Sequence, residues 1–322
     1  MTYYEWKKEI IVNYQSEKEH DMRQFGIQVI SDIDDSGKEL ICSSIYGTNN
    51  NAILKNALGS AENVAIIVGF GGNTNLHLGH LLLSNELRFY LNKINNPKFY
   101  FVNFDADEDK SFVNKIKLLS EDSGKSMDYE IIDYKNLAAL KLRRKIAQSL
   151  NINTVNRVMG WQNENMQSYE KTLDMLTTFS LGSILQEHQS IILTDINQKT
   201  YYALYKQIEN RISNQDTCFV YHLLIPSLKS PTERMSIKNP KSLIYLDDSN
   251  DEIENKLKKS YSGVENKETT CSILRVADLL LSDDKTMRLV NNCINTANGC
   301  KNCKANNITM LSNEIIKRKT RR

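Results

Sequence analysis

The chain has 322 residues, of which 40% are hydrophobic and 25% charged, and its formal net charge is +2. This length leaves room for one large domain or two, and a nearly neutral balance gives no general case for binding nucleic acid. The longest apolar runs are too short to cross a bilayer, and the N-terminus lacks the apolar core of a signal peptide. Six cysteines in a chain of this size do not suggest a disulfide scaffold. From these features together we expect a cytoplasmic protein without a membrane partner.

Predicted strands and helices alternate along most of the chain, as judged from the apolar periodicity and the turn residues. The predicted strands are residues 63–68, 98–104, 190–194 and 218–225, and the predicted helices are residues 6–15, 17–24, 112–120, 135–150, 199–213 and one that starts near Leu78. Such alternation is typical of an α/β fold with a parallel sheet. From about residue 250 the pattern is helical throughout, so we expect a domain boundary there.

Two histidines flank a glycine where the helix after the first strand should begin. His77, Leu78, Gly79 and His80 follow a glycine-rich turn at residues 69–74. A helix N-terminus offers free N–H groups and partial positive charge, and imidazoles there can donate hydrogen bonds to phosphate as charge accumulates during nucleotidyl transfer. A glycine between them lets a flat base lie close to the backbone. The alternative is that both histidines cap the helix or lie on the surface.

A second motif lies far downstream, in residues 231–248, and contains Arg234, Met235, Ser236, Pro240 and Ser242. A mobile cationic loop of this kind can close over a triphosphate and offset the charge that builds on pyrophosphate. A plain basic turn is the alternative interpretation.

Together these motifs resemble class I aminoacyl-tRNA synthetases. His77-Leu78-Gly79-His80 matches their His-x-Gly-His signature, and residues 234–242 resemble their second signature in its tryptophanyl form. Further segments resemble archaeal and eukaryotic tryptophanyl enzymes in chain order, namely residues 22–28, 107–110, 196–202, 280–285 and 299–322. The resemblance implies a Rossmann-like catalytic domain at residues 1–250, with an N-terminal extension and inserted helices near 135–185. An all-helical domain of the tRNA-binding type would follow at 251–322.

The same resemblance implies ATP-dependent activation of an amino acid and its transfer to tRNA. The expected catalytic residues are His77, His80, Arg234 and Ser236; Gly69, Gly71, Gly79 and Met235 complete the nucleotide-binding set; and Ile67, Asn103, Asn197 and Gln198 would contact the amino acid. Mg²⁺ is implied with ATP, although no carboxylate cluster in the sequence identifies protein ligands for it. A homodimer is implied as well.

The amino-acid side departs from the family. Ile67 replaces the tyrosine that contacts the indole nitrogen in eukaryotic enzymes, and Asn197 replaces an aspartate. Isoleucine has no hydrogen-bonding group, and losing such a bond changes substrate discrimination. In the second signature, Arg234 replaces lysine, and Ile237 and Lys238 replace the usual fourth and fifth residues. Three alternatives therefore stay open: a diverged paralogue that uses another amino acid or serves a specialised pathway, a module that binds tRNA or nucleotide without turnover, and an unrelated nucleotidyltransferase.

Three further features have two interpretations each. Cys300 and Cys303, with Cys271 and Cys293 upstream, have zinc-ligand spacing, but there is no second Cys-x-x-Cys, and we expect structural thiols and no metal. The basic end at residues 317–322 is either a solvated helix end or a contact with the tRNA backbone. Trp161 and Tyr169 line a pocket or belong to the core.

Overall fold

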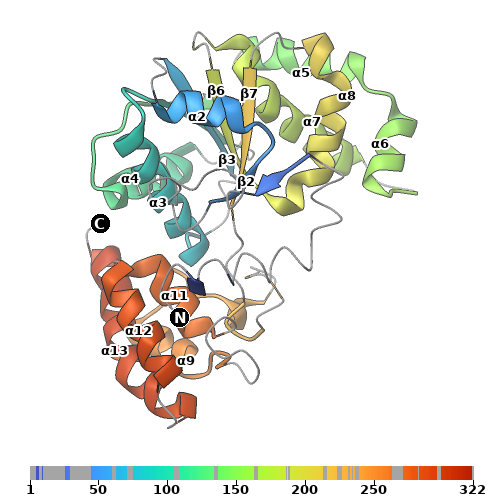
Figure 1. Ribbon diagram of the computed structural model, residues 1–322. Helices are drawn as coiled ribbons and strands as arrows, with labels where there is room; N and C mark the ends of the chain where they lie inside the picture. Colours follow the sequence, from blue (N-terminus) through green and yellow to red (C-terminus); the bar gives the residue numbers. More distant parts are fainter. Residues whose placement is uncertain are drawn as a thin grey trace.

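The computed structural model describes residues 5–6, 9, 26–29, 45–59, 63–70, 75–103, 109–133, 137–162, 166–185, 187, 189–212, 216–222, 227–230, 233, 235, 239–262, 271–281, 283–295 and 299–320. These residues form a seven-stranded sheet with the order β1-β2-β7-β6-β3-β4-β5 (Figure 1). The strands are β1 (Gln28–Val29), β2 (Ile45–Thr48), β3 (Val64–Phe70), β4 (Lys98–Asn103), β5 (Tyr129–Asp133), β6 (Gln189–Asp195) and β7 (Asp216–His222).

The strands from β7 to β5 are parallel, whereas β1 and β2 add an antiparallel edge beside β7. Strand β3 comes first of the parallel strands in the chain and lies at their centre. The chain then builds outward on one side through β4 and β5, and on the other side through β6 and β7. The reversal falls between β3 and β6, and parallel sheets of this type bind ligands at the carboxyl ends of the strands at such a reversal.

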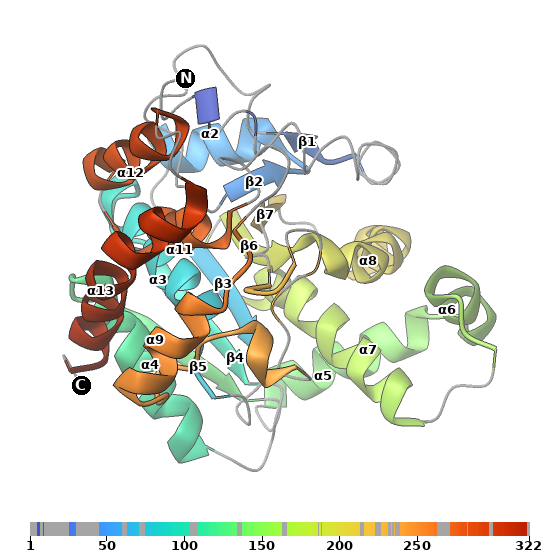
Figure 2. The same cartoon turned by 90° about the horizontal axis from the view of Figure 1, so that it is seen from below.

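Helices cover both faces of the sheet, because side chains along β3 alternate between two hydrophobic cores. Val64, Ile66 and Val68 face the core under α2 (Asn51–Gly59), α3 (Leu78–Lys93) and α4 (Asp109–Ser123). Ala65 and Ile67 face the opposite core. Figure 2 shows α3 and α4 on one side of the sheet and α7 and α8 on the other.

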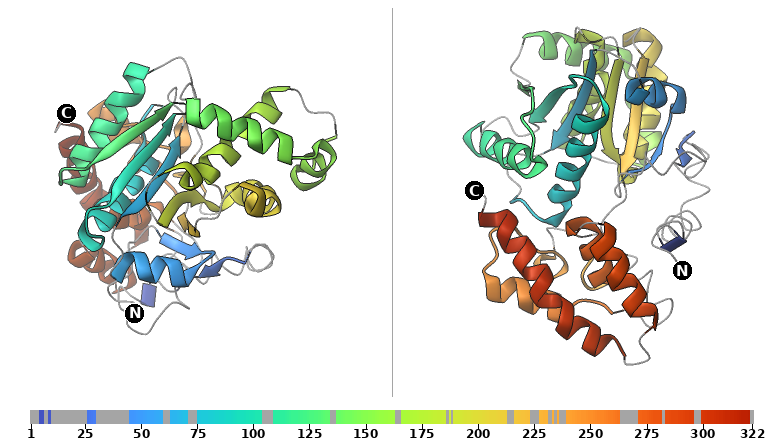
Figure 3. Two further views of the ribbon diagram at one scale, coloured as in Figure 1. Left: turned by 90° about the horizontal axis from the view of Figure 1, so that it is seen from above. Right: turned by 60° about the vertical axis from the view of Figure 1, so that its left-hand side comes forward.

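The second face is covered by helices that follow β5 and β6. They are α5 (Leu137–Ser149), α6 (Ile152–Met159), α7 (Met166–Ser180), the 3₁₀ helices η2 (Leu181–Ile184) and η3 (Ile196–Gln198), and α8 (Lys199–Ile212). The elements from α5 to η2 lie between β5 and β6 in the chain and project to one side of the sheet (Figure 3, left).

The C-terminal helices form a third cluster beyond the carboxyl ends of the strands (Figure 3, right). They are α9 (Asn250–Lys258), α11 (Ser272–Leu280), α12 (Asp283–Asn295) and α13 (Gly299–Thr320), preceded by the 3₁₀ helix η4 (Pro240–Ser242). Their core includes Leu78 and Leu81 from the start of α3, and also Trp6, which is fully buried. The start of α3 therefore belongs to the contact between the sheet domain and the C-terminal helices.

The predicted fold class is confirmed, and the predicted strands at 63–68, 98–104, 190–194 and 218–225 correspond to β3, β4, β6 and β7. Strands β2 and β5 and helix α2 were not predicted. Of the first predicted N-terminal helix, residues 6 and 9 are described and helical; the rest of it and all of the second lie outside the described residues. The domain division at residue 250 remains a prediction. Within the described part of the chain, no helix has the length and apolar character needed to span a membrane.

Candidate active site

The two histidines of the first motif form a reciprocal cap at the start of α3. Nδ1 of His77 accepts a hydrogen bond from the backbone N–H of Gly79 at 3.0 Å, and Nδ1 of His80 accepts one from the backbone N–H of His77 at 3.1 Å. A capping box normally uses a hydroxyl and a carboxylate for these roles. Here imidazoles fill both, so the capping interpretation is confirmed. Because capping uses only Nδ1, it is compatible with a second role.

The capping bonds determine which nitrogen carries the proton. A nitrogen that accepts a hydrogen bond is unprotonated, so each neutral imidazole has its hydrogen on Nε2. Burial lowers the pKa of His77 to about 4. Burial, together with the neighbouring His77, lowers the pKa of His80 to about 3. The two rings lie with centroids 4.3 Å apart. At neutral pH they are therefore two adjacent, uncharged N–H donors at the positive end of a helix.

Gly79 is required by the position of the His77 ring. A Cβ at residue 79 would lie 2.7 Å from Cε1 and 3.0 Å from Nδ1 of His77, and 2.7 Å is closer than nonbonded atoms approach. The imidazole folds over the first turn of α3 to reach the backbone of residue 79, and any side chain there would displace it. Space for an adenine ring remains a prediction for this glycine.

The second motif lies directly beside the first. Leu78 donates its backbone N–H to the carbonyl of Ile244 at 3.1 Å, and Leu246 donates to the carbonyl of Leu76 at 2.8 Å. These bonds enclose an antiparallel bridge between His77 and Tyr245. We call residues 243–246 the bridging strand. It fixes the end of the second motif against the segment that carries His77.

The base of the second motif is closed by two more backbone hydrogen bonds. Ser227 donates to the carbonyl of Glu233 at 2.7 Å, and Leu228 donates to the carbonyl of Ser242 at 2.8 Å. Met235 is half-buried against the core that contains the start of α3. Arg234, Ser236, Ile237 and Lys238 lie outside the described residues, so their contacts remain predictions. Glu233 and Met235, the described neighbours of Arg234, belong to this closed region.

Residues expected to contact the amino acid and the nucleotide lie at the ends of three neighbouring strands. Asn103 is buried at the carboxyl end of β4, and Gly69 lies near the end of β3, opposite Val102. Gln198, in η3 after β6, accepts a hydrogen bond from the hydroxyl of Thr194. These ends meet at the edge of the sheet where the strand order reverses. Gly71 lies outside the described residues.

Two of the expected amino-acid contacts differ in their surroundings. Ile67 is fully buried in the middle of β3, in register with Tyr100 on β4 and Ile192 on β6. Asn197 is exposed, and its backbone N–H donates to Oδ1 of Asp195 at 2.7 Å. Of the two departures from the family pattern, Ile67 is therefore part of a hydrophobic core, whereas Asn197 is on the surface.

The aromatic pair and the cysteines contribute structural contacts. The rings of Trp161 and Tyr169 meet edge to face with centroids 5.4 Å apart, and both pack on the core beneath α5, α7 and α8. Cys271 is buried and Cys293 half-buried, and neither forms a disulfide. The side chains of Cys300 and Cys303 lie outside the described residues. Among those that are described, no three His, Cys, Asp or Glu residues form a metal-binding group.

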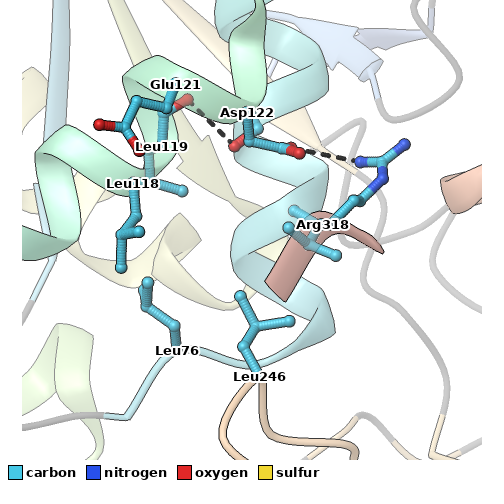
Figure 4. A pocket seen from close by; sticks show the side chains of 9 residues that line it. Leu76, Leu118, Leu119, Glu121, Asp122, Leu246 and Arg318 are labelled. Atoms are coloured by element: carbon cyan, nitrogen blue, oxygen red, sulfur yellow. Dashed lines mark hydrogen bonds and ion pairs between the residues drawn. The ribbon is translucent and has the colours of Figure 1, made fainter. Parts of the chain in front are cut away.

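The basic end of the chain bonds to the protein itself. Arg318 has a side chain only 9% exposed; it pairs with Asp122 of α4 at 3.2 Å and donates to the carbonyl of Leu280 at 3.0 Å. Lys319 donates to the carbonyl of Asp248 at 2.7 Å. In Figure 4, Arg318 points toward Asp122 beside a cavity of about 20 Å³ that Leu76 and Leu246 also line. Arg318 and Lys319 therefore have partners within the protein, and a contact of residues 317–322 with the tRNA backbone remains a prediction.

Comparison with known proteins found similar sequences and similar structures. No family model matches the chain. The cytoplasmic tryptophan–tRNA ligase of Dictyostelium discoideum is 24% identical over 213 residues, which cover 58% of this chain and 53% of the relative. The tryptophan–tRNA ligase of Pyrobaculum arsenaticum is 22% identical over 215 residues, which cover 62% and 57%. The matches thus span little more than half the length of these curated relatives.

Among solved structures, tryptophanyl-tRNA synthetase from Aeropyrum pernix aligns with a TM-score of 0.76 at 17% identity, covering 95% of this chain and 93% of that one. The tryptophanyl-tRNA synthetase homolog from Entamoeba histolytica aligns with a TM-score of 0.75 at 12% identity, covering 93% and 90%. The sheet order, the two-histidine helix start and these alignments define the fold of a class I aminoacyl-tRNA synthetase. In sequence the chain is similar to the tryptophan–tRNA ligases at 24% identity or less, as its motifs had indicated.

Proposed function

We propose that this protein activates an amino acid with ATP to form an aminoacyl-adenylate and pyrophosphate, and then transfers the aminoacyl group to tRNA. The observation that supports this most directly is the backbone pairing of the two motifs. His77 lies at the start of α3 with the bridging strand of the second motif hydrogen-bonded on both sides of it. One motif supplies donors for phosphate and the other supplies the loop that closes over it.

The reaction needs charge stabilisation at two places. A carboxylate oxygen of the amino acid attacks the α-phosphorus of ATP, and the bond to the pyrophosphate oxygen breaks. His77 and His80 donate from Nε2 to oxygens of the α-phosphate region, where charge builds in the transition state. Arg234 and Ser236 approach the triphosphate from the second loop, and arginine can hold phosphate through two parallel hydrogen bonds. Mg²⁺ bound with ATP would neutralise part of the phosphate charge.

The amino-acid pocket is proposed to accept a substrate other than tryptophan, or a wider range of substrates. Asn103 and Gln198 offer amide groups at the carboxyl ends of β4 and β6. Ile67 offers only hydrocarbon. A pocket that lacks a partner for the indole N–H loses the discrimination that such a bond provides.

Pyrophosphate exchange measured separately with each of the twenty amino acids tests both parts of this proposal. Strong exchange with one amino acid other than tryptophan, or with several, supports the diverged paralogue. Exchange with tryptophan alone contradicts it and leaves an ordinary tryptophanyl enzyme. Charging of total tRNA with the preferred amino acid then tests the transfer step.

The second candidate is a module that binds nucleotide or tRNA without turnover. It is favoured by Ile237 and Lys238, which alter the second signature next to a changed pocket. ATP binding by calorimetry, together with no exchange for any amino acid, would support this candidate against the enzyme.

The remaining expectations concern assembly and location. A homodimer in the cytoplasm, with residues 251–322 as the tRNA-binding region, follows from the likeness to the relatives. Light scattering of the purified protein tests the dimer, and tRNA binding by the protein with charge-reversed residues on α9 or α12 tests the tRNA-binding surface.

A further inference from the structure

A tight turn at residues 245–249 connects the C-terminal helices to the strand that pairs with the segment carrying His77. We propose that Asp248, within this turn, is a positioning residue that holds the bridging strand against His77 and so fixes residues 239–242, the described end of the second motif, beside the proposed ATP site. The expected effect on kinetics rests on the proposed function, whereas the positioning of the bridging strand rests on the geometry alone.

Asp248 organises the turn through one carboxylate oxygen. Oδ2 accepts a hydrogen bond from the backbone N–H of Tyr245 at 2.9 Å and another from Nζ of Lys256 on α9 at 2.6 Å. The side chains of Asp248 and Lys256 are 10% and 19% exposed, so water screens their attraction only weakly. Nζ of Lys256 also lies 5.3 Å from the centre of the Tyr245 ring. The lysine thus holds both the carboxylate and the residue to which the carboxylate bonds.

The bridging strand passes this constraint on to the site. Tyr245 is the residue that bridges His77, and its neighbours Ile244 and Leu246 bond to Leu78 and Leu76. Ser242, the residue before the bridging strand, closes the base of the second motif through Leu228. A shift of Tyr245 would therefore move the cap of α3 and the end of the second loop together.

The C-terminal helix reinforces the turn from a second direction. Lys319 on α13 donates to the backbone carbonyl of Asp248, and Asn75 donates to Oδ2 of Asp247 at 3.3 Å. One residue earlier on α13, Arg318 is bound to Asp122 of α4, which anchors the helix to the sheet domain (Figure 4). Asp248 is thus in contact with cations from two C-terminal helices and with the strand beside His77.

The kinetic test compares four variants by pyrophosphate exchange with the preferred amino acid. Asp248→Ala removes the acceptor of the Tyr245 N–H, Asp248→Asn keeps an acceptor but loses the charge, and Lys256→Met removes the cation. Lys258→Met is the matched control, because Lys258 is an exposed residue on the same helix whose ion pair is with Glu254, at 3.1 Å. Lys258→Met makes the same change two residues after Lys256 and should leave the turn intact.

We expect Asp248→Ala to raise the KM for ATP and to lower kcat, each on the order of 10-fold, because small displacements of catalytic groups are costly. The KM for the amino acid should not change, since that pocket lies at the ends of β4 and β6. Asp248→Asn should recover most of the loss, Lys256→Met should lie between, and Lys258→Met should match the wild type. A purely structural role would lower kcat only in proportion to the titrated fraction of active sites, with both KM values unchanged, and that result would overturn the proposal.

Hydrogen exchange of the substrate-free protein tests the positioning without any activity. The backbone N–H groups of Leu78 and Leu246 do not contact Asp248, yet both should exchange faster in Asp248→Ala, while those of β6 keep their wild-type rates. Unchanged protection at these two amides overturns the inference. Faster exchange in a protein that shows no pyrophosphate exchange with any amino acid would support the positioning role and reject the proposed enzyme. If Asp248→Ala does not fold, Lys256→Met serves for the same comparison.

Discussion

The two halves of the candidate site are built differently. On the phosphate side, His77, Gly79 and His80 lie within four consecutive residues, and each contact among them is local. On the amino-acid side, Ile67, Asn103 and Gln198 come from three strands that meet only in the folded sheet. The first half carries the signature residues of the family that the sequence resembles, and the second departs from that family's pattern at Ile67, a position that we propose contacts the substrate.

This difference explains why chemistry can be inferred from the sequence more securely than specificity. A helix cap depends on backbone N–H groups that any chain provides, so the phosphate side needs only the right residues at the right spacing. The amino-acid side depends on which side chains face one another across β3, β4 and β6. The largest effects should therefore come from changes to the local half, and subtler ones from changes to the assembled half.

Loss of His80 should have the largest effect on activity. His80→Ala removes an Nε2–H donor from the start of α3, and removal of one such donor typically costs on the order of 10²–10³-fold in kcat. Pyrophosphate exchange should fall by that amount, while circular dichroism shows a folded protein, because a lost helix cap costs only about 1 kcal/mol. Exchange at the wild-type rate would remove His80 from the catalytic set.

Gly79→Ala should have the next largest effect on activity. Alanine favours the helix by about 1 kcal/mol over glycine, but its Cβ would collide with the His77 ring. We expect a folded protein whose exchange rate falls on the order of 10²-fold as His77 is displaced. Gly59→Ala is the matched control, since a Cβ at the end of α2 meets nothing within 4 Å. Equal activity of the two variants would contradict the role of the His77 ring.

The sequence was sufficient to predict the parts of the fold that depend on local pattern. The alternation of strands and helices, the start of α3 near Leu78 and the resemblance of the second motif all follow from residues close together in the chain. The missed elements have weak patterns: β2 is four residues long and includes Gly47, and β5 is short and only partly buried. Neither has the continuous apolar run that marks β3.

The contacts that join distant segments could not be predicted. The pairing of residues 76–78 with the bridging strand links positions about 170 apart, as in the 172-residue separation of Asn75 and Asp247. The steric reason for Gly79 depends on the His77 rotamer, which no spacing reveals. Ser249 and Glu252 form a capping box that marks the start of α9. That signal would have placed Asp248 before a helix, without showing that it bonds to Tyr245 and Lys256.

The depressed histidine pKa values predict how the stability of the phosphate side depends on pH. His77 and His80 have folded-state pKa values of about 4 and about 3, below the value of 6.5 expected in the unfolded chain. Between these limits the unfolded state binds more protons, so the stability that depends on neutral imidazoles is present above pH 6.5 and is lost as the pH falls toward 4. The free energy of unfolding should thus drop between pH 7 and pH 5.

His80→Gln isolates this contribution, because glutamine keeps an acceptor for the His77 N–H but does not titrate. Denaturant unfolding at both pH values should show a smaller pH dependence in the variant than in the wild type. Parallel dependence in the two proteins would show that His80 does not contribute.

The smallest expected effect is on substrate selection, and comparing substitutions at Ile66 and Ile67 separates it from an effect on stability. Ile66 and Ile67 are adjacent on β3, are both fully buried, and face opposite cores. Ile66→Val and Ile67→Val each delete one buried methyl group, and each should cost about 1 kcal/mol in the free energy of unfolding. Only Ile67→Val should change the ranking of amino acids in pyrophosphate exchange, since only residue 67 faces the core next to the proposed pocket. If both variants keep the wild-type ranking, the altered specificity must come from another position, and the exposed Asn197 is then the next residue to change.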